Sequence, residues 1–493
     1  MQITLFLTMS LLLAAVVCPA DAASLNLVPW PKKMTMGKGD LTLPARLPIK
    51  VAGSDKKAAK KVAETFAVDL KEIGFTPTLV EGSKAVGITL SITDEPSLGK
   101  EDYRLWVDKE IRISAPTERG LFWGTRTALQ LLSAGPDVPV PTLSIQDKPE
   151  FGYRGFMVDV ARNFHAIEFH KRMVKNLARY KINVYHIHFS DDQSYTLPSD
   201  AFPNLPTPGR HYTKEQLKDL VKLAERYNIT IVPEIDVPGH ASSLCAAVPD
   251  FVCQGKPPRW MICAGSERSY AAIEALISET MDIFPGPYFH IGADEVDLSS
   301  WDGCPDCEAL VAKEGLKDKE ALYNHFINRL NCFVKSKGRK TIAWEGFKPG
   351  VKPEVDKDVM VEEFANYPAT PPDSLMNAGY NLINASWSPL YICQDDASTP
   401  EVIAEWNALY FNGKRPPVPL DKMLKIKPDK RLKGVSMCSW ENTEESEEAA
   451  IFGTAAAVKG YSTRAPRLQI FSERAWTGDK TSSEDLLARI GVK

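Results

Sequence analysis

Two neighbouring carboxylates, Asp294 and Glu295, follow the small and apolar residues of the segment HIGADEV at 290–296. Adjacent acids repel each other, yet these two end a run that has the pattern of a buried strand. A turn of the backbone at the strand end would let both side chains reach one site. We expect Glu295 to be a general acid with a pKa raised by burial and by the nearby charge, while Asp294 holds an N–H group of a substrate. On spacing alone the alternative is that Asp294 caps the following loop and Glu295 pairs with a lysine or an arginine.

Similar side chains stand at the ends of seven other strand-like segments. These ends are Asp159 to Arg162, His188 to Asp192, Glu234 to His240, Trp344 and Glu345, Glu362 to Phe364, Ser386 and Trp387, and Trp440 and Glu441. One acidic strand end is often a solvated cap, but acids, aromatic rings or an arginine at every end indicate a binding site. Aromatic faces stack on the apolar face of a pyranose ring, while carboxylates and arginine bind its hydroxyl groups. The set therefore favours a sugar ligand.

The segments that carry these residues alternate with helical patterns from residue 149 onward. Runs rich in β-branched and aromatic residues predict strands at 153–160, 183–190, 229–237, 288–295, 341–346, 359–364, 381–386 and 434–440. Amphipathic patterns between most of them predict helices, the last one near 449–460. Eight parallel strands with intervening helices predict an α/β fold, a (β/α)8 TIM barrel over residues 149–493. Its active site is expected at the carboxyl ends of the strands.

Residues 23–148 have a different pattern and predict a small α/β domain in front of the barrel. Strand-like segments at 41–53, 85–93, 103–115 and 138–147 accompany two amphipathic helical patterns. We expect this domain to have a supporting role, because it shows no catalytic constellation.

The N-terminal residues predict where the protein is located, and its net charge limits the classes of partner that we expect. Residues 3–17 are almost wholly apolar, and Ala20-Asp21-Ala22 fits a signal-peptidase site, so residues 1–22 predict a cleaved signal peptide and an exported protein, secreted or periplasmic. An uncleaved anchor is the alternative. The formal net charge of −4 gives no reason to expect a nucleic-acid partner, and we expect no membrane contact beyond the leader.

Eight cysteines follow the leader, and an even number permits disulfides in an exported protein. Cys304 and Cys307 also have the spacing of metal ligands, and Cys245, Cys253 or Cys263 could complete a zinc site. Because only one CxxC pair is present, the pattern favours disulfides or free buried thiols over structural zinc.

Several motifs resemble one enzyme family. HIGADEV resembles the H-x-G-G-D-E signature of the family 20 glycoside hydrolases, the β-N-acetylhexosaminidases. YRGFMVDVARNF, HIHFSDDQ and PEIDVPGHA are similar to the family's first three barrel strands, FSERAW to its last helix, and GLFWGTRTALQLL to the helix of its small preceding domain. The resemblance runs from about residue 40 to residue 480. It implies removal of terminal β-linked N-acetylhexosamine (GlcNAc or GalNAc) from glycans by a retaining, substrate-assisted mechanism through an oxazolinium intermediate, with no cofactor.

The same resemblance implies roles for individual residues. Asp294 would orient the acetamido group, Glu295 would be the acid and then the base, and Tyr391 would donate to the acetamido oxygen. The residues that match the family's substrate-binding positions are Arg162, Asp191, His240, Trp344, Phe364, Trp440 and Glu441. Two of these side chains also have an alternative structural role: Trp344 could pack inside the barrel, and His240 could cap a loop.

Four positions depart from the family pattern. Ala293 replaces a glycine of the signature, Phe364 replaces a tryptophan of the acetamido pocket, and Cys393 replaces an acid or amide. Glu441 and Asn442 follow Trp440 where the family has Trp-x-Glu, so either of the two could bind the outer hydroxyl groups. These departures leave the terminal sugar open between GlcNAc and GalNAc. They also leave open a preference for sulfated sugars and the release of disaccharides.

Two other classes of function compete with this hypothesis. One is a sugar-binding protein that has kept the barrel and lost turnover. The other is a conventional two-carboxylate glycosidase that uses a pair such as Asp191 and Glu295.

Overall fold

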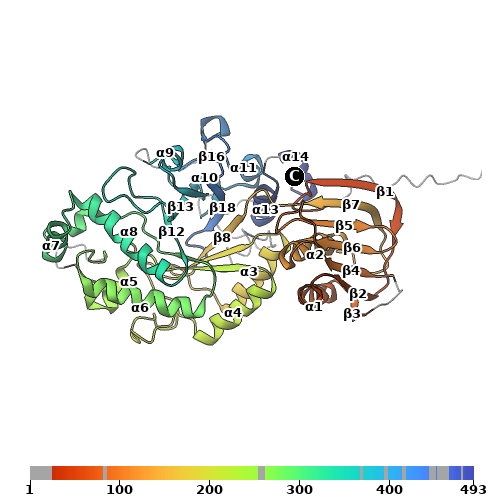
Figure 1. Ribbon diagram of the computed structural model, residues 1–493, viewed down its shortest axis with the longest axis horizontal. Coiled ribbons are helices and arrows are strands. Elements are labelled where there is room, and N and C mark those ends of the chain that lie inside the picture. The colour runs from red at the N-terminus through yellow and green to blue at the C-terminus, as the bar shows by residue number, and fades with distance from the viewer. Residues whose placement is uncertain are drawn as a thin grey trace, which may run out of the picture.

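The computed structural model describes residues 25–81, 86–253, 261–366, 370–393, 398–413, 418–443, 451, 466–478 and 481–492. The expected leader at 1–22 lies outside this part, and so does nearly all of the helix expected near 449–460. Figure 1 shows two units side by side, with a sheet domain on one side and a barrel on the other.

The N-terminal unit is a seven-stranded mixed sheet with the strand order β1-β7-β5-β6-β4-β2-β3. Its elements are β1 (Lys33–Leu41), β2 (Arg46–Gly53), α1 (Lys56–Glu72), β3 (Thr76–Val80), β4 (Ile88–Ile92), β5 (Tyr103–Val107), β6 (Ile111–Ala115), α2 (Glu118–Leu131) and β7 (Val140–Asp147). Two of these strands, β1 and β3, were not expected from the sequence. They form the two edges of the sheet, where a strand is half solvated and its apolar alternation is weak.

Both helices of this unit start where a side chain satisfies the first free N–H groups. Asp55 accepts a hydrogen bond from the Ala58 N–H at the start of α1, and Thr117 accepts one from the Gly120 N–H at the start of α2. In Figure 1 the two helices lie on the face of the sheet that is turned toward the barrel. The helices therefore form the layer through which the two units meet.

The second unit is the expected (β/α)8 barrel, and each of the eight predicted strands is present. Its strands are β8 (Tyr153–Asp159), β9 (Val184–His188), β10 (Thr230–Glu234), β11 (Tyr288–His290), β12 (Lys340–Trp344), β13 (Met360–Glu363), β14 (Asn381–Asn384) and β18 (Leu432–Ser439). Neighbouring strands pair in parallel, and β14 closes the ring by pairing with β18, which also pairs with β8. The fold class predicted from the sequence is confirmed.

Helices and short elements fill the connections of the barrel. The longer helices are α3 (Ile167–Arg179), α4 (Lys214–Arg226), α6 (Glu267–Ile283), α8 (Lys319–Ser336) and α13 (Arg467–Thr477). The shorter elements are α5 (Ser242–Ala247), η2 (Pro249–Phe251), η3 (Leu298–Trp301), α7 (Pro305–Lys313), α9 (Pro372–Asn377), α10 (Trp387–Leu390), β15 (Tyr391–Ile392), α11 (Pro400–Glu405), β16 (Tyr410–Phe411), η4 (Leu420–Lys422), β17 (Leu424–Lys425) and α14 (Ser483–Arg489). None of the helices in the described ranges is long and apolar enough to cross a bilayer.

The inside of the barrel is filled by three layers of side chains. The layer at the amino ends of the strands is apolar and contains Tyr153, Val184, Val232, Ile342, Met360 and Ile383. A buried polar layer above it contains His186, Glu234, His290, Glu362 and Ser436. The layer at the mouth is hydrophobic, with three aromatic rings, and contains Met157, Trp344, Phe364, Ala385, Tyr391 and Cys438. A polar layer thus lies between two hydrophobic ones, directly beneath the rings at the end where barrel enzymes place their active sites.

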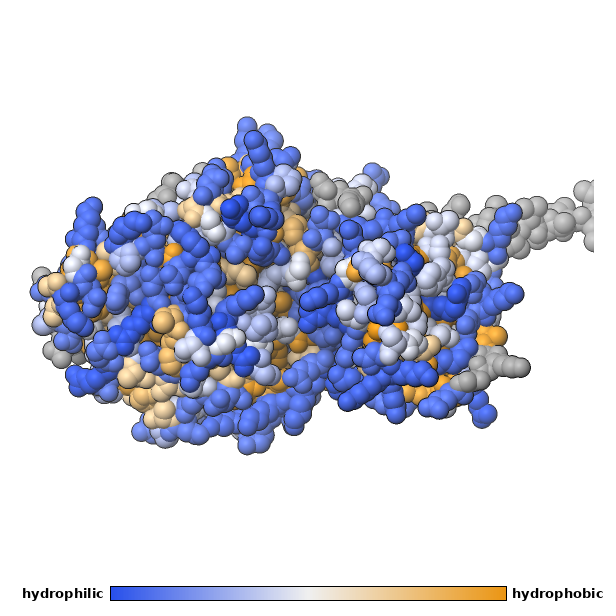
Figure 2. All heavy atoms as spheres, in the orientation of Figure 1, coloured by the Kyte–Doolittle hydropathy of each residue, from blue (hydrophilic) through white to orange (hydrophobic). Residues whose placement is uncertain are grey.

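The outer surface carries few large exposed apolar side chains. Among the described residues these are Val68, Val86 and Val138, which are 38 %, 48 % and 39 % exposed. The face drawn in Figure 2 is largely hydrophilic, with apolar atoms in scattered groups.

Candidate active site

One pocket at the barrel mouth gathers almost every residue expected in the site. It is lined by Arg162, His188, Asp191, Asp236, His240, Asp294, Glu295, Phe364, Trp387, Tyr391, Cys393, Trp440 and Glu441. These residues come from the ends of seven of the eight barrel strands or from the segments that follow them, so the pocket exists only in the closed ring. Trp344 is the one expected site residue that does not line it.

The turn after β11 brings the two neighbouring acids to this pocket. Gly292, Ala293 and Glu295 all have positive φ angles, of 67°, 74° and 47°. The backbone therefore turns sharply within four residues, and both acids line the same pocket. Asp236 fixes the turn, because its Oδ1 accepts a hydrogen bond of 3.0 Å from the Ala293 N–H. A Cβ atom on Gly292 would lie 1.8 Å from this oxygen, so the contact requires glycine.

Asp294 is the more buried of the two acids, with 9 % of its surface exposed. Burial raises its pKa, and the charge of Glu234 adds to the effect. Burial and the Asp294 carboxylate together raise the pKa of Asp236 well above its usual range. Among the described residues, Asp294 Oδ1 has no hydrogen-bond partner although it is buried. This atom is an acceptor without a donor, in the wall of a pocket.

Glu295 lies at the outer edge of the pocket, and its side chain is 51 % exposed. Its carboxylate lies 3.4 Å from His240 Nε2, and this contact lowers its pKa. The expectation that burial raises the pKa of Glu295 is therefore wrong for the free protein. The physical reason is that the turn carries Glu295 outward to a cationic partner, whereas Asp294 turns inward.

His240 joins the two acids to Asp191. Its ring nitrogens lie 3.4 Å from Asp191 Oδ1, 3.8 Å from Asp294 Oδ2 and 3.4 Å from Glu295 Oε2. Burial opposes protonation, but the contact with Asp191 and the charges of the two acids raise the pKa of His240 well above its usual range. His240 is therefore an imidazolium at neutral pH, and it neutralises part of the negative charge of the site.

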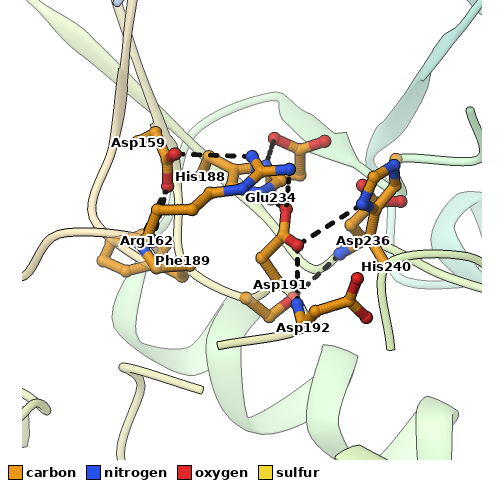
Figure 3. Close-up of polar contacts among 12 residues, drawn as sticks. Asp159, Arg162, His188, Phe189, Asp191, Asp192, Glu234, Asp236 and His240 are labelled. Atoms are coloured by element: carbon orange, nitrogen blue, oxygen red, sulfur yellow. Dashed lines mark hydrogen bonds and ion pairs between the residues drawn. The ribbon is translucent and has the colours of Figure 1, made fainter. Parts of the chain in front are cut away.

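Asp191 is held in place by three donors and by an ion pair with His240, contacts that Figure 3 shows in part. Its Oδ2 accepts 2.8 Å contacts from His188 Nε2 and Arg162 Nη2, and its Oδ1 accepts from the Asp192 N–H at 2.6 Å. Burial favours its neutral form, yet the hydrogen bonds from His188 and His240 hold its pKa below the usual range. Asp191 therefore stays charged and fixes the orientation of His240.

Arg162 lies between Asp159 and Asp191 with its guanidinium at the pocket wall (Figure 3). The Nη1 atom is 3.4 Å from Asp159 Oδ2, and the guanidinium carbon lies 5.2 Å from the centre of the Trp440 ring. Two carboxylates and one ring therefore leave the arginine little freedom, as suits a group that grips hydroxyl groups.

Four aromatic rings make the apolar wall of the pocket. Phe364 and Tyr391 stack with centroids 6.1 Å apart and an angle of 5°, and Trp387 and Trp440 lie 5.7 and 5.8 Å from Tyr391. β15 places Tyr391 here by pairing with the end of β18. Burial raises the pKa of Tyr391 well above its usual range, so its hydroxyl remains a donor.

Trp344 lies beneath this wall and is fully buried. Its ring contacts Phe364 and Trp440, both with centroids 5.8 Å away, and its Nε1 donates to Glu234 Oε1 at 2.7 Å. Trp344 is therefore a packing residue of the barrel and not part of the pocket wall. It acts by supporting the rings that line the pocket.

Glu441, and not Asn442, takes the pocket position at the end of β18. Glu441 lines the pocket with a φ of 61°, and its N–H lies 3.2 Å from Asp159 Oδ2. The Asn442 amide is buried and donates to Ile392 O and Ser439 Oγ, both at 2.9 Å. The open choice between the two residues is therefore decided in favour of Glu441.

Sequence reasoning missed three lining residues. Asp236 and His188 were visible only as polar strand ends, and Trp387 only as an aromatic residue after a strand. Their type gave no signal that they contact the acids. Asp236 is a carboxylate two residues past the end of β10. That position was the sequence feature that could have indicated a contact with Asp294.

Among the cysteines expected to be disulfides or metal ligands, Cys393 lines this pocket and Cys438 packs with the rings of its wall. In the described chain all eight are free, so none is in a disulfide. Cys304 and Cys307 lie together with Cys253 and Cys263, whereas Cys245 is outside this group.

Two family models match the chain. "Glycosyl hydrolase family 20, domain 2" matches residues 24–148, and "Glycosyl hydrolase family 20, catalytic domain" matches residues 151–479. The chain belongs to glycosyl hydrolase family 20. The barrel and the preceding sheet domain therefore correspond to the two matched domains of this family, as the motifs indicated.

Relatives and solved structures agree with this assignment. A Beta-hexosaminidase of Vibrio furnissii is 28 % identical over 90 % of this chain and 78 % of its own length. One of Porphyromonas gingivalis is 30 % identical over 67 % of this chain, which spans 47 % of that relative. The crystal structure of a GH20 exo β-N-acetylglucosaminidase from Vibrio harveyi in complex with N-acetylglucosamine is 26 % identical, with a TM-score of 0.76 over 95 % of this chain and 76 % of that one.

Proposed function

We propose that this chain is an exo-acting β-N-acetylhexosaminidase that removes a terminal β-linked N-acetylhexosamine from glycans. The observation that carries the proposal is the buried Asp294 Oδ1, which has no donor in the described structure and lies beside Glu295 in an aromatic-walled pocket. The N–H of a 2-acetamido group is a donor of the kind this atom lacks.

The geometry supports a reaction in which the nucleophile belongs to the substrate. The acetamido oxygen attacks the anomeric carbon, while Asp294 binds the acetamido N–H and stabilises the positive charge of the oxazolinium intermediate. Tyr391 donates to the acetamido oxygen from the opposite wall. The stacked rings of Phe364 and Tyr391 hold the methyl group and orient the sugar.

Glu295 is placed to protonate the leaving oxygen and then to activate water. In the free protein its pKa is lowered by His240. A glycan bound over its exposed side chain removes water from it, and burial of a carboxylate raises its pKa toward the acid form. Substrate binding therefore supplies the burial that the free site does not.

The test is hydrolysis of nitrophenyl β-glycosides by the wild type and by two variants. We expect release from the N-acetylglucosaminide or the N-acetylgalactosaminide. Glu295→Gln and Asp294→Asn should each lower kcat by about 10²-fold or more, because one removes the acid and the other the charge beside the nucleophile. If Asp294→Asn kept the wild-type rate, Asp294 would not be the residue that orients the acetamido group.

Substrate choice separates the competing functions. Plain β-glucosides lack the acetamido nucleophile, so equal rates on them would favour a conventional two-carboxylate enzyme. Sugar binding without release from either amino sugar would indicate a lectin-like protein. A panel that adds sulfated and disaccharide β-glycosides tests the finer specificity that Phe364, Cys393 and Glu441 influence.

We further propose that the protein is exported, secreted or periplasmic. The support is the apolar run at 3–17 followed by the Ala20-Asp21-Ala22 pattern. N-terminal sequencing of the protein recovered from its native host should begin near residue 23. A chain in the cytoplasmic fraction that still begins at Met1 would contradict this.

A further inference from the structure

A cluster of four cysteine side chains lies outside the residues that line the pocket. The Sγ atoms of Cys253 and Cys307 are 3.8 Å apart, those of Cys263 and Cys304 are 3.7 Å apart, and those of Cys263 and Cys307 are 3.8 Å apart. All four sulfur atoms lie within 4.8 Å of one another. They come from two separate segments, one after β10 and one after β11.

These distances match a tetrahedral metal site. With Zn–S bonds of about 2.3 Å, the sulfur atoms at the corners of a tetrahedron lie about 3.8 Å apart. Disulfide sulfurs lie about 2.05 Å apart, so the cluster does not have the spacing of bonded pairs. Four thiols that merely fill a core have no reason to bring all their sulfur atoms within 4.8 Å of one another.

The surroundings are those of a closed structural site. The four side chains are buried, with exposures of 7 % for Cys253, 1 % for Cys263, 0 % for Cys304 and 2 % for Cys307. Four sulfur ligands complete a tetrahedron, which leaves no position for water or substrate. Soft thiolate ligands in this geometry select zinc over the hard cations.

The backbone also favours thiolates here. Cys304 is the N-cap of α7 and Cys307 lies in its first turn, where the helix dipole stabilises negative charge. On the other segment, the Gly265 N–H donates to Cys263 Sγ. A Cβ atom on Gly265 would lie 2.2 Å from the Cys307 nitrogen, so a glycine is needed for the two segments to approach.

We propose that Cys253, Cys263, Cys304 and Cys307 bind one zinc ion as a structural site. The ion ties the segment after β10 to the segment after β11. Both segments lead to the active site, because the Ile262 N–H donates to Pro238 O at 2.9 Å, two residues before His240. Trp301 Nε1 donates to Ile262 O at 3.0 Å and links the second segment to the first. Zinc therefore acts as a structural tie between these two segments, and takes no part in the reaction.

The first test is the metal content of the untagged wild-type protein after dialysis. We expect about one zinc per chain. A mercurial reagent that binds thiols should release this zinc, as followed with a chromogenic chelator. Replacement by cobalt should give thiolate-to-cobalt charge-transfer bands and the visible absorption of a tetrahedral site.

Variants then locate the ion. Cys304→Ser and Cys307→Ser should lower the zinc content to less than about a tenth of the wild-type value. Cys332→Ser is the matched control, because Cys332 is an exposed thiol of α8 outside the cluster, and it should keep the zinc. If a cluster variant does not fold, mercurial release and cobalt spectra of the wild type still decide the question.

Three results would overturn the proposal. They are a wild-type protein without zinc, zinc that survives in Cys304→Ser and Cys307→Ser, and a denatured mass that shows two disulfides among the four cysteines. Iron in place of zinc would overturn the assignment of the metal.

Discussion

At the scale of the residue, the most informative contact is the one between His240 and Glu295. The imidazolium lies 3.4 Å from the Glu295 carboxylate and lowers its pKa in the free protein. The same ring lies 3.8 Å from Asp294. One cation therefore balances two acids that need opposite protonation states for the reaction.

We predict that His240→Asn moves the basic limb of the pH profile of kcat/KM to higher pH. Removal of the cation raises the pKa of Glu295, and the acid must be protonated to act, so activity should persist further into alkaline solution. The measurement is the pH dependence of kcat/KM on a nitrophenyl substrate. His211→Asn, at an exposed histidine of the surface, serves as the control and should leave the limb in place. An unmoved or lowered limb in His240→Asn would contradict the electrostatic role.

At the scale of the element, the turn that ends β11 explains how neighbouring acids share a site. Ala293 has a φ of 74° in this turn and is fully buried. Its carbonyl accepts a hydrogen bond from the Tyr323 hydroxyl of α8. A residue with a Cβ atom is strained at positive φ, and the family signature has glycine here.

We predict that Ala293→Gly raises the free energy of unfolding by about 1 kcal/mol, because it removes the strain of a left-handed alanine. Urea unfolding gives the value. Ala272→Gly, in the interior of α6, is the matched control and should change stability in the opposite direction by about 1 kcal/mol or more. A destabilised Ala293→Gly would mean that the methyl group packs well enough to outweigh the strain.

At the scale of the whole molecule, buried polar contacts join the sheet domain to the barrel. Lys181 of the barrel lies 2.9 Å from Asp147 of β7 and from the Tyr103 hydroxyl of β5, and Trp476 of α13 donates to Asp147 at 3.0 Å. Arg154 of β8 pairs with Glu101 at 2.6 Å. The supporting role of the first domain therefore has a physical basis, since it anchors β8 and the segment before β9.

We predict that Lys181→Met lowers the free energy of unfolding by about 3–5 kcal/mol, because it leaves the buried Asp147 without its cation. Thermal and urea unfolding of the full chain measure the loss. Lys214→Met removes the exposed pair with Asp200 and should have little effect. Equal stability of the two variants would show that the contacts between the domains contribute little.

The sequence by itself determined the fold class and most of the site. Eight apolar runs with polar ends were enough to predict the barrel, since strands buried on both faces must be continuously apolar and barrel sites must lie at strand ends. The adjacency of Asp294 and Glu295 suggested a division of labour between them, but spacing alone left open a loop cap and an ion pair, and the roles came from the family resemblance. The edge strands β1 and β3 were not predicted, because a half-solvated strand has only a weak alternation of apolar and polar residues.

Only the tertiary structure decided which atoms meet. It placed Trp344 beneath the pocket, chose Glu441 over Asn442, and turned Glu295 outward to His240, which reversed the expected direction of its pKa. It also brought Cys253 and Cys263 to Cys304 and Cys307. Periodicity and spacing are local properties of the chain, whereas burial, charge balance and ligand distances depend on segments that become neighbours only when the barrel closes.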